Sequence, residues 1–322
     1  MNTNIERLDM IGILPVVSIP DPEKAVATAQ AVAAGGLPAI EVTFRNVHAA
    51  ESIRRIHEAE PDIFLGAGTV LTKEQADLAL DNGAAFLVTP SFNEQVIVHV
   101  LKRGGTIIPG CASPSEVEKA MQLGLDTVKI FPAESLGGAQ FIKALSGPYS
   151  NMRFLPTGGI NVNNMVSYLG QKQVVACGGS WLAPKTLIDA GDFSVISAMC
   201  NEAVATMLGY EMRHIGINNP GAEEAKIVAE RFVEVFGIPI SKEGKGAIFV
   251  GTYAEVLKKM FLGDNGHIAM ATNCIHRAIY QMERNGVKIN HDSAVYSPGT
   301  GEMIAIYLED EIGGFAVHLL QK

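Results

Sequence analysis

The sequence predicts an α/β protein: a (β/α)8 TIM barrel followed by a smaller α+β domain of paired βαβββ modules. Short apolar, β-branched runs alternate with helix-like segments over the first two thirds of the chain, and this alternation stops near Leu208. A different pattern then occurs twice. With 48% hydrophobic and 18% charged residues, the 322-residue chain has enough apolar surface to form packed cores. We therefore expect two domains, residues 1–207 and 208–322.

Eight strand-like runs define the expected barrel. They are Ile13 to Ile19, Ala39 to Phe44, Ile63 to Ala67, Ala85 to Val88, Thr106 to Pro109, Thr127 to Phe131, Arg153 to Pro156 and Val174 to Cys177. Segments with helical spacing separate them, and this order predicts a parallel sheet that closes into a barrel. The alternative is an open doubly wound sheet, but no Gly-x-Gly-x-x-Gly motif follows the first run.

The charge balance excludes two classes of partner. A net charge of -9, from 25 basic and 34 acidic residues, argues against nucleic acid and anionic membranes, because both require clustered Lys and Arg. No apolar stretch reaches the roughly 18 to 20 residues of a membrane span, and the start, Met1 to Glu6, lacks the pattern of a secretory leader. We expect a cytoplasmic protein. Its four cysteines are too widely spaced for a disulfide framework or a zinc knuckle.

Polar residues occupy one face of the second strand. A period of two places Glu41, Thr43 and Arg45 opposite the apolar Ile40 and Val42. In a barrel strand the apolar face packs on the helices, so the polar residues point to the interior or to the carboxyl-end rim. A charge there must be paired or used in chemistry. A structural Glu–Arg pair is the alternative.

Lys129 is the polar residue of the sixth strand and is expected inside the barrel. Burial there would favour the neutral amine, which can attack a carbonyl and form a Schiff base. The alternative is a structural ion pair between Lys129 and Glu41.

Two pairs of glycines end the seventh and eighth strands, in Thr157-Gly158-Gly159 and Gly178-Gly179-Ser180. Backbone amides can approach an anion closely at such glycines, and the loops after these two strands are the usual phosphate site of this barrel. The rim of the third strand adds the hydroxyl of Thr69, either a donor to a substrate carboxylate or a turn residue.

Five ordered motifs, at Glu41 to Arg45, Gly66 to Val70, Lys129 to Glu134, Pro156 to Ile160 and Gly178 to Trp181, closely resemble those of the 2-keto-3-deoxy-6-phosphogluconate (KDPG) and 4-hydroxy-2-oxoglutarate (KHG) aldolase family. The resemblance covers residues 5 to 207. It implies a metal-independent lyase in which Lys129 forms the Schiff base and Glu41 is the general acid and base. The substrate-binding residues that it implies are Arg45, Thr69, Pro90, Phe131, Thr157, Gly158, Gly159, Gly179 and Ser180.

The same resemblance implies cleavage of KDPG, or its galactonate epimer, to pyruvate and D-glyceraldehyde 3-phosphate by a trimer. Cleavage of 4-hydroxy-2-oxoglutarate to pyruvate and glyoxylate is the alternative. A phosphosugar epimerase would use similar glycine pairs, but the presence of Lys129 disfavours it.

The last third of the chain is a duplication. Arg213-His214-Ile215 and Gly266-His267-Ile268 each precede a helical segment, Ala222 to Phe236 and Cys274 to Arg284, and further strand-like runs follow both helices. Such paired halves resemble the vicinal oxygen chelate superfamily, the glyoxalase-like fold.

Carried over by position, that second resemblance implies a divalent metal held by His214, Glu255, His267 and His318, although His318 stands where a glutamate is more usual. Three imidazoles and one carboxylate suit zinc, nickel, manganese or iron. The alternative is a metal-free module that senses a ligand or assembles the protein.

Overall fold

The computed structural model describes residues 3–322. It divides into two compact units, Met1–Met207 and Leu208–Lys322. Met1 and Asn2, part of the start from which the lack of a leader was inferred, lie outside the described residues. Within residues 3–322 no helix combines the length and apolar character needed to cross a membrane.

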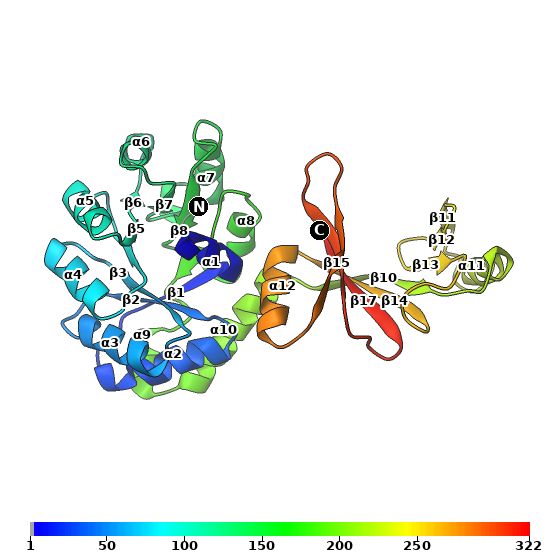
Figure 1. Cartoon of the computed structure of the whole chain (residues 1–322), viewed down its shortest axis with the longest axis horizontal. Helices are drawn as coiled ribbons and strands as arrows, with labels where there is room; N and C mark the ends of the chain where they lie inside the picture. The colour runs from blue at the N-terminus through cyan, green and yellow to red at the C-terminus, as the bar shows by residue number, and fades with distance from the viewer. Residues whose placement is uncertain (1–2) are drawn as a thin grey trace. The chain divides into compact units, whose positions relative to one another are not determined.

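The first unit is a parallel barrel, which confirms the predicted fold class (Figure 1). Its strands are β1 Ile13–Val17, β2 Ala39–Thr43, β3 Phe64–Gly68, β4 Phe86–Val88, β5 Thr106–Ile108, β6 Gly110–Cys111, β7 Thr127–Ile130, β8 Arg153–Pro156 and β9 Cys177–Gly179. One sheet runs β5-β4-β3-β2-β1-β9 and a second runs β6-β7-β8. Bridges from Phe154 to Val174 and from Thr157 to Gly178 join β8 to the β9 segment and close the ring.

Helices surround these strands (Figure 1). They are α1 Thr3–Ile11, α2 Ala25–Ala34, α3 Ala49–Ala59, α4 Lys73–Asp81, α5 Glu94–Lys102, α6 Pro114–Gln122, α7 Gly138–Ser146, α8 Met165–Leu169, α9 Lys185–Ala190 and α10 Phe193–Leu208. Side-chain caps fix where several of them begin: Thr72, Asn93 and Ser113 accept hydrogen bonds from backbone amides in the first turns of α4, α5 and α6.

Two expected strands differ from the observed ones. The fifth barrel strand is broken into β5 and β6 at Pro109, which has no backbone N–H to donate to the ladder. The eighth was expected at Val174 to Cys177, but the ladder with β1 runs from Cys177 to Gly179. Residues 174–177 are apolar and resemble a strand, whereas glycines, which pattern reasoning assigns to loops, form most of the actual strand.

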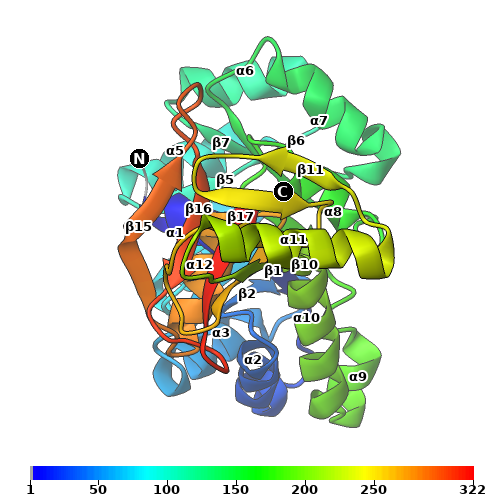
Figure 2. The ribbon, with the colours of Figure 1, turned by 90° about the vertical axis from the view of Figure 1, so that its right-hand side faces the viewer.

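The second unit holds two βαβββ halves in one sheet (Figures 1 and 2). The first half contains β10 Glu211–Ile217, α11 Ala222–Phe236, β11 Ile240–Glu243, β12 Ala247–Val250 and β13 Ala254–Leu257. The second contains β14 Gly266–Thr272, α12 Ile275–Arg284, β15 Ile289–Tyr296, β16 Met303–Leu308 and β17 Phe315–Gln321. In each half the first and last strands are parallel, and β10 pairs antiparallel with β14 to join the halves.

The first half has the fourth strand that the sequence pattern did not reveal. All four residues of this strand, β11, are exposed, so no apolar alternation marks it. On one face of the sheet, α11 packs Ala225 and Ala229 against Ile248 and Val256.

Candidate active site and histidine cluster

Glu41 and Lys129 are the two buried charged groups of the barrel interior. Glu41 on β2 is 0% exposed and Lys129 on β7 is 5% exposed. Neither oxygen of the Glu41 carboxyl has a hydrogen-bond partner within the described chain. No ion pair joins Glu41 to Lys129 among residues 3–322 either, so the two groups are not held as the static pair considered above.

Their environment favours the neutral form of both groups. Burial raises the pKa of Glu41 above its usual value, against the opposing attraction of Lys129 and Arg45. Burial likewise lowers the pKa of Lys129, against the attraction of Glu41. Only a neutral amine has the lone pair for attack on a carbonyl, and the lowered pKa of Lys129 favours that form.

Two glycines of β3 leave room for neighbouring side chains, Gly68 for the carboxyl of Glu41 and Gly66 for the ring of Phe86. A Cβ on Gly68 would overlap Oε1 of Glu41, and a Cβ on Gly66 would overlap the ring of Phe86. On the other side, Nζ of Lys129 lies 5.1 Å from the centroid of the Phe131 ring. Thr43 does not join this group, because its hydroxyl donates a hydrogen bond to the Val17 carbonyl at 2.9 Å.

The predicted substrate-binding residues follow the carboxyl ends of parallel strands, and in a barrel these ends form one rim. Arg45 lies two residues beyond β2, is exposed, and has no ion pair in the described part of the chain. Thr69, directly after β3, has a φ of 55°, a strained value for a residue other than glycine. Pro90 follows β4, and its backbone fills the space in which a Cβ on Gly110 would lie.

The two glycine pairs lie side by side. The bridge between Thr157 and Gly178 brings the loop after β8 next to β9. Gly158 and Gly159 have φ values of 98° and 81°, a conformation that other residues rarely adopt. Gly179 ends β9, and Ser180 after it is exposed. The hydroxyl of Thr157 is buried without a hydrogen-bond partner among residues 3–322.

One pair beside these loops was not foreseen. The hydroxyl of Tyr168 on α8 donates a hydrogen bond to the carboxylate of Glu134, and the Glu134 side chain fills the space next to Gly159. Tyr168 stands among apolar residues of a short helix, so no sequence pattern pointed to this contact.

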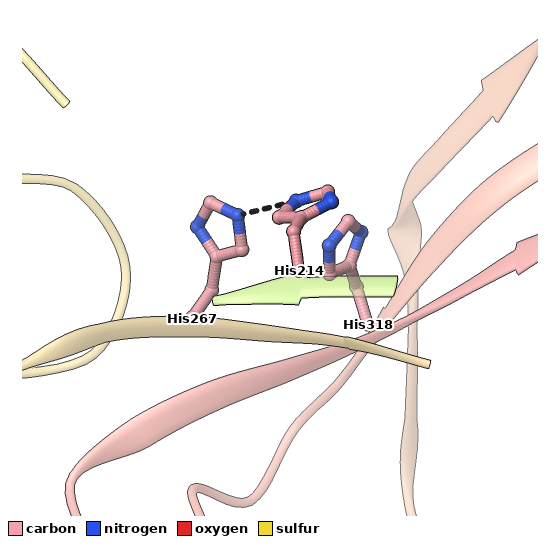
Figure 3. A group of neighbouring side chains, drawn as sticks. All are labelled: His214, His267 and His318. Atoms are coloured by element: carbon pink, nitrogen blue, oxygen red, sulfur yellow. Dashed lines mark hydrogen bonds between the residues drawn. The ribbon is translucent and has the colours of Figure 1, made fainter. Parts of the chain in front are cut away.

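In the second unit, strands β10, β14 and β17 bring His214, His267 and His318 together (Figure 3). One ligand nitrogen from each lies within 4.8 Å of the others. Nε2 of His214 is 3.2 Å from Nε2 of His267. Glu255 on β13 lies against two of the three histidines: its Oε2 is 3.3 Å from Nε2 of His214 and 3.4 Å from Nε2 of His267.

The donor set fits a divalent cation. Nδ1 of His267 and Nε2 of His318 are buried and have no hydrogen-bond partner in the described chain. Hydrogen bonds from His214 and His267 lower the pKa of Glu255 to about 2, and burial lowers the pKa of His318 to about 4. An ionised carboxylate and a neutral imidazole are the forms that bind metals.

A cavity of about 400 Å³ lies against this cluster. Its lining residues come from six strands and their connections, and they are Lys242, Gly244, Gly246, Ala247, Phe249, Glu255, Leu257, Lys259, Phe261, His267, Tyr307 and His318. The Tyr307 ring stacks on the His318 ring with centroids 4.7 Å apart.

Comparison with known proteins concerns the barrel. The chain is 47% identical over 204 residues to a 2-dehydro-3-deoxy-phosphogluconate aldolase of Treponema pallidum, covering 63% of this chain and 97% of that protein. It is 39% identical over 203 residues to the KHG/KDPG aldolase of Escherichia coli K12, covering 63% of this chain and 95% of that protein.

Among solved structures, KDPG aldolase from Legionella pneumophila, with pyruvate captured at low pH as a covalent carbinolamine intermediate, superposes with a TM-score of 0.61. It is 33% identical, with 63% of this chain and 98% of that chain covered. The family model for KDPG and KHG aldolase matches residues 5–199, more than half of the 322 residues. The chain therefore belongs to the KDPG and KHG aldolase family.

Proposed function

We propose that the first unit is a class I Schiff-base aldolase that cleaves KDPG, or its galactonate epimer, to pyruvate and D-glyceraldehyde 3-phosphate. The observation that carries this proposal is the pair of buried groups in the barrel interior. Within residues 3–322, Lys129 has no ion pair and the carboxyl of Glu41 has no hydrogen-bond partner. The names of the Treponema and Legionella relatives support the substrate, and the covalent carbinolamine named for the Legionella enzyme supports the chemistry.

In the proposed reaction the neutral amine of Lys129 attacks the C2 carbonyl of the keto acid. Loss of water from the carbinolamine gives a protonated imine, which accepts the electron pair when the C3–C4 bond breaks. Glu41 takes the proton of the C4 hydroxyl, so that glyceraldehyde 3-phosphate leaves and an enamine of pyruvate remains. Protonation of the enamine carbon and hydrolysis of the imine release pyruvate and restore Lys129. None of these reaction steps needs a metal.

The rim residues take the binding roles. Arg45 is exposed and forms no ion pair with any residue that the structure describes, so its guanidinium is available to hold the substrate carboxylate. The Thr69 hydroxyl is the second donor. Pro90 and Phe131 form walls of the pocket. The phosphate is received by the two adjacent loops, through Thr157, Gly158, Gly159, Gly179 and Ser180.

Borohydride trapping with pyruvate tests the nucleophile. We expect reduction to add one pyruvate-derived group to the native chain at Lys129, and none to Lys129→Ala, which also loses turnover. The exposed Lys143 on α7 gives the matched control, and Lys143→Ala keeps both activities. Trapping by Lys129→Ala at the rate of the native chain would remove Lys129 from the mechanism. The same trapping excludes a phosphosugar epimerase, which forms no imine.

Turnover of both phosphorylated six-carbon substrates and of 4-hydroxy-2-oxoglutarate, measured side by side, tests the substrate. The Escherichia coli relative is named for both KHG and KDPG, which keeps 4-hydroxy-2-oxoglutarate as the alternative. A higher kcat/KM for the phosphorylated substrates is expected, because only they can use the paired glycine loops. Assembly as a trimer and a place in the cytoplasm remain predictions from the family resemblance and the sequence.

For the second unit we infer a glyoxalase-like domain with a divalent-metal site at His214, Glu255, His267 and His318. The paired βαβββ order and the grouping of three imidazole nitrogens within 4.8 Å of one another support this assignment. A metal bound there supplies a Lewis acid that can coordinate an oxygen of a ligand. Elemental analysis and Zn²⁺ or Ni²⁺ titration of the full chain test it. We expect one ion per chain, lost in His267→Gln combined with His318→Gln and kept in the control His291→Gln, an exposed histidine paired with Glu283.

A further inference from the structure

The cavity beside the histidine cluster has the size and the lining of a small-molecule site. Its volume of about 400 Å³ lies within the range of ligand pockets, roughly 300–1,000 Å³. Phe249, Leu257 and Phe261 give it apolar walls, while Tyr307 and His318 contribute polar atoms. Such a mixture can hold a short carbon skeleton and orient it through a few polar groups.

Two lysines contribute positive charge to the lining of this cavity. Lys242 and Lys259 line the cavity, are exposed, and form no ion pair within residues 3–322. Lys258, the neighbour of Lys259 that does not line the cavity, is by contrast neutralised by Glu243 at 2.7 Å. The chain as a whole carries a net charge of -9, so two unpaired lysines at one cavity do not reflect a generally basic surface.

The carboxylate in the cavity lining already has partners. Glu255 is the one acidic residue among those that line the cavity, and its carboxylate lies 3.3 Å and 3.4 Å from two imidazole nitrogens. The remaining lining residues are neutral or histidine. Nζ of Lys242 lies 5.8 Å from the centroid of the Phe249 ring, a contact that leaves its charge in place. No carboxylate within residues 3–322 neutralises the ammonium groups of Lys242 and Lys259, and these charges favour an anion.

We propose that this cavity binds a small organic anion, a metabolite of a few carbon atoms that carries a carboxylate or a phosphate group. The lysines receive the anionic group, and the aromatic walls contact the carbon skeleton. The inference rests on the proposed assignment of the second unit as a glyoxalase-like domain. It does not require the metal, because the lysines supply the charge.

Histidine resonances of the full chain test this proposal at the cavity itself. The protein, labelled with ¹³C-histidine, is titrated without metal with D-3-phosphoglycerate, pyruvate, inorganic phosphate and, as an uncharged control, glycerol. Assignment by His→Gln variants separates the signals of His267 and His318 from those of the other six among eight histidines. We expect saturable shifts of both signals with 3-phosphoglycerate or pyruvate and none with glycerol. The comparison of pyruvate with inorganic phosphate tells a carboxylate site from a phosphate site.

The lysines are tested by Lys242→Gln combined with Lys259→Gln. Two exposed charges together are worth about a tenfold increase in Kd, and the increase should shrink in high salt. The matched control is Lys245→Gln, since Lys245 lies on the same hairpin but does not line the cavity. The proposal is overturned if no anion shifts the two signals, or if the double variant binds as tightly as the native chain. A failure of metal uptake would be seen separately, in the metal titration.

Discussion

Tyr168 donates a hydrogen bond from its hydroxyl to the carboxylate of Glu134, and the Glu134 side chain packs against Gly159. Tyr168 is fully buried, so the contact ties a fixed point of α8 to the loop after β7. Through Glu134, the contact reaches the loop of Gly158 and Gly159. We therefore expect Tyr168 to act on the proposed phosphate site as a positioning residue.

Tyr168→Phe should therefore weaken phosphate recognition and spare the chemistry. Loss of one hydrogen bond of about 1 kcal/mol predicts a roughly fivefold higher KM for phosphorylated substrate, with kcat nearly unchanged. The KM for 4-hydroxy-2-oxoglutarate, which has no phosphate, should not change. Steady-state kinetics with both substrates measures the split. Tyr149→Phe is the control. The Tyr149 hydroxyl donates a 2.9 Å hydrogen bond to Glu118, which is not part of these loops. Equal effects on both substrates would show a general loss of structure instead.

Gly68→Ala tests whether the empty space at Gly68 positions the acid–base group. The added Cβ would overlap Oε1 of Glu41, so the carboxyl must rotate away. We expect kcat to fall by about 100-fold, the scale of a misplaced general base. Imine trapping with pyruvate should still occur, because Lys129 is untouched. The control Gly147→Ala meets no atom closer than 3.8 Å and should behave as the native enzyme. A native kcat in Gly68→Ala would contradict the idea that catalysis depends on the present position of the Glu41 carboxyl.

The pKa of Glu41 predicts how stability depends on pH. Because burial raises this pKa in the folded state, the folded chain holds the proton more tightly than the unfolded chain. The contribution of Glu41 is therefore most favourable below its usual value of about 4.5, and it is lost as the pH rises through the folded-state pKa.

Glu41→Gln removes this dependence. The variant should match the native chain in melting temperature near pH 4 and exceed it increasingly towards pH 8, while its turnover is lost. Thermal unfolding followed by circular dichroism across this range measures the difference. Glu202→Gln, at an exposed carboxylate on α10, is the control. Its melting temperature should differ from that of the native chain by the same amount at every pH. A native chain that gains stability relative to Glu41→Gln on going from pH 4 to pH 8 would contradict the sign.

Much of the barrel and of its site could be predicted, because both follow from the order of strands and helices along the sequence. Alternating strands and helices fix a parallel barrel, and the residues after each strand must meet at one rim, which is why Arg45, Thr69 and Gly158 could be grouped from the sequence. The exposed strand β11, the glycine-built β9 and the Tyr168–Glu134 contact could not be predicted. The two strands lack an apolar pattern, and the contact joins residues 34 positions apart through tertiary packing alone.

Truncation tests where the aldolase unit ends and whether the second unit serves it. The family match stops at residue 199, yet α10 continues to Leu208 and buries Cys200 and Ala203 completely. Cys200 lies against Gly35 at the end of α2, so tightly that a Cβ on Gly35 would overlap it. A chain ending at Met207 should thus fold and keep native kcat. One ending at residue 199 should melt at least ~3 °C lower, since burying such side chains is worth more than about 1 kcal/mol.

Calorimetry, kinetics and light scattering on both truncated chains measure the outcome. Unchanged activity, affinity and oligomeric state in the chain ending at Met207 would leave the second unit without a role in the aldolase reaction. Loss of the oligomer in that chain would instead make the second unit an assembly domain. Equal stability of the two truncated chains would contradict the packing argument, because the segment from Cys200 to Met207 would then contribute nothing to the barrel.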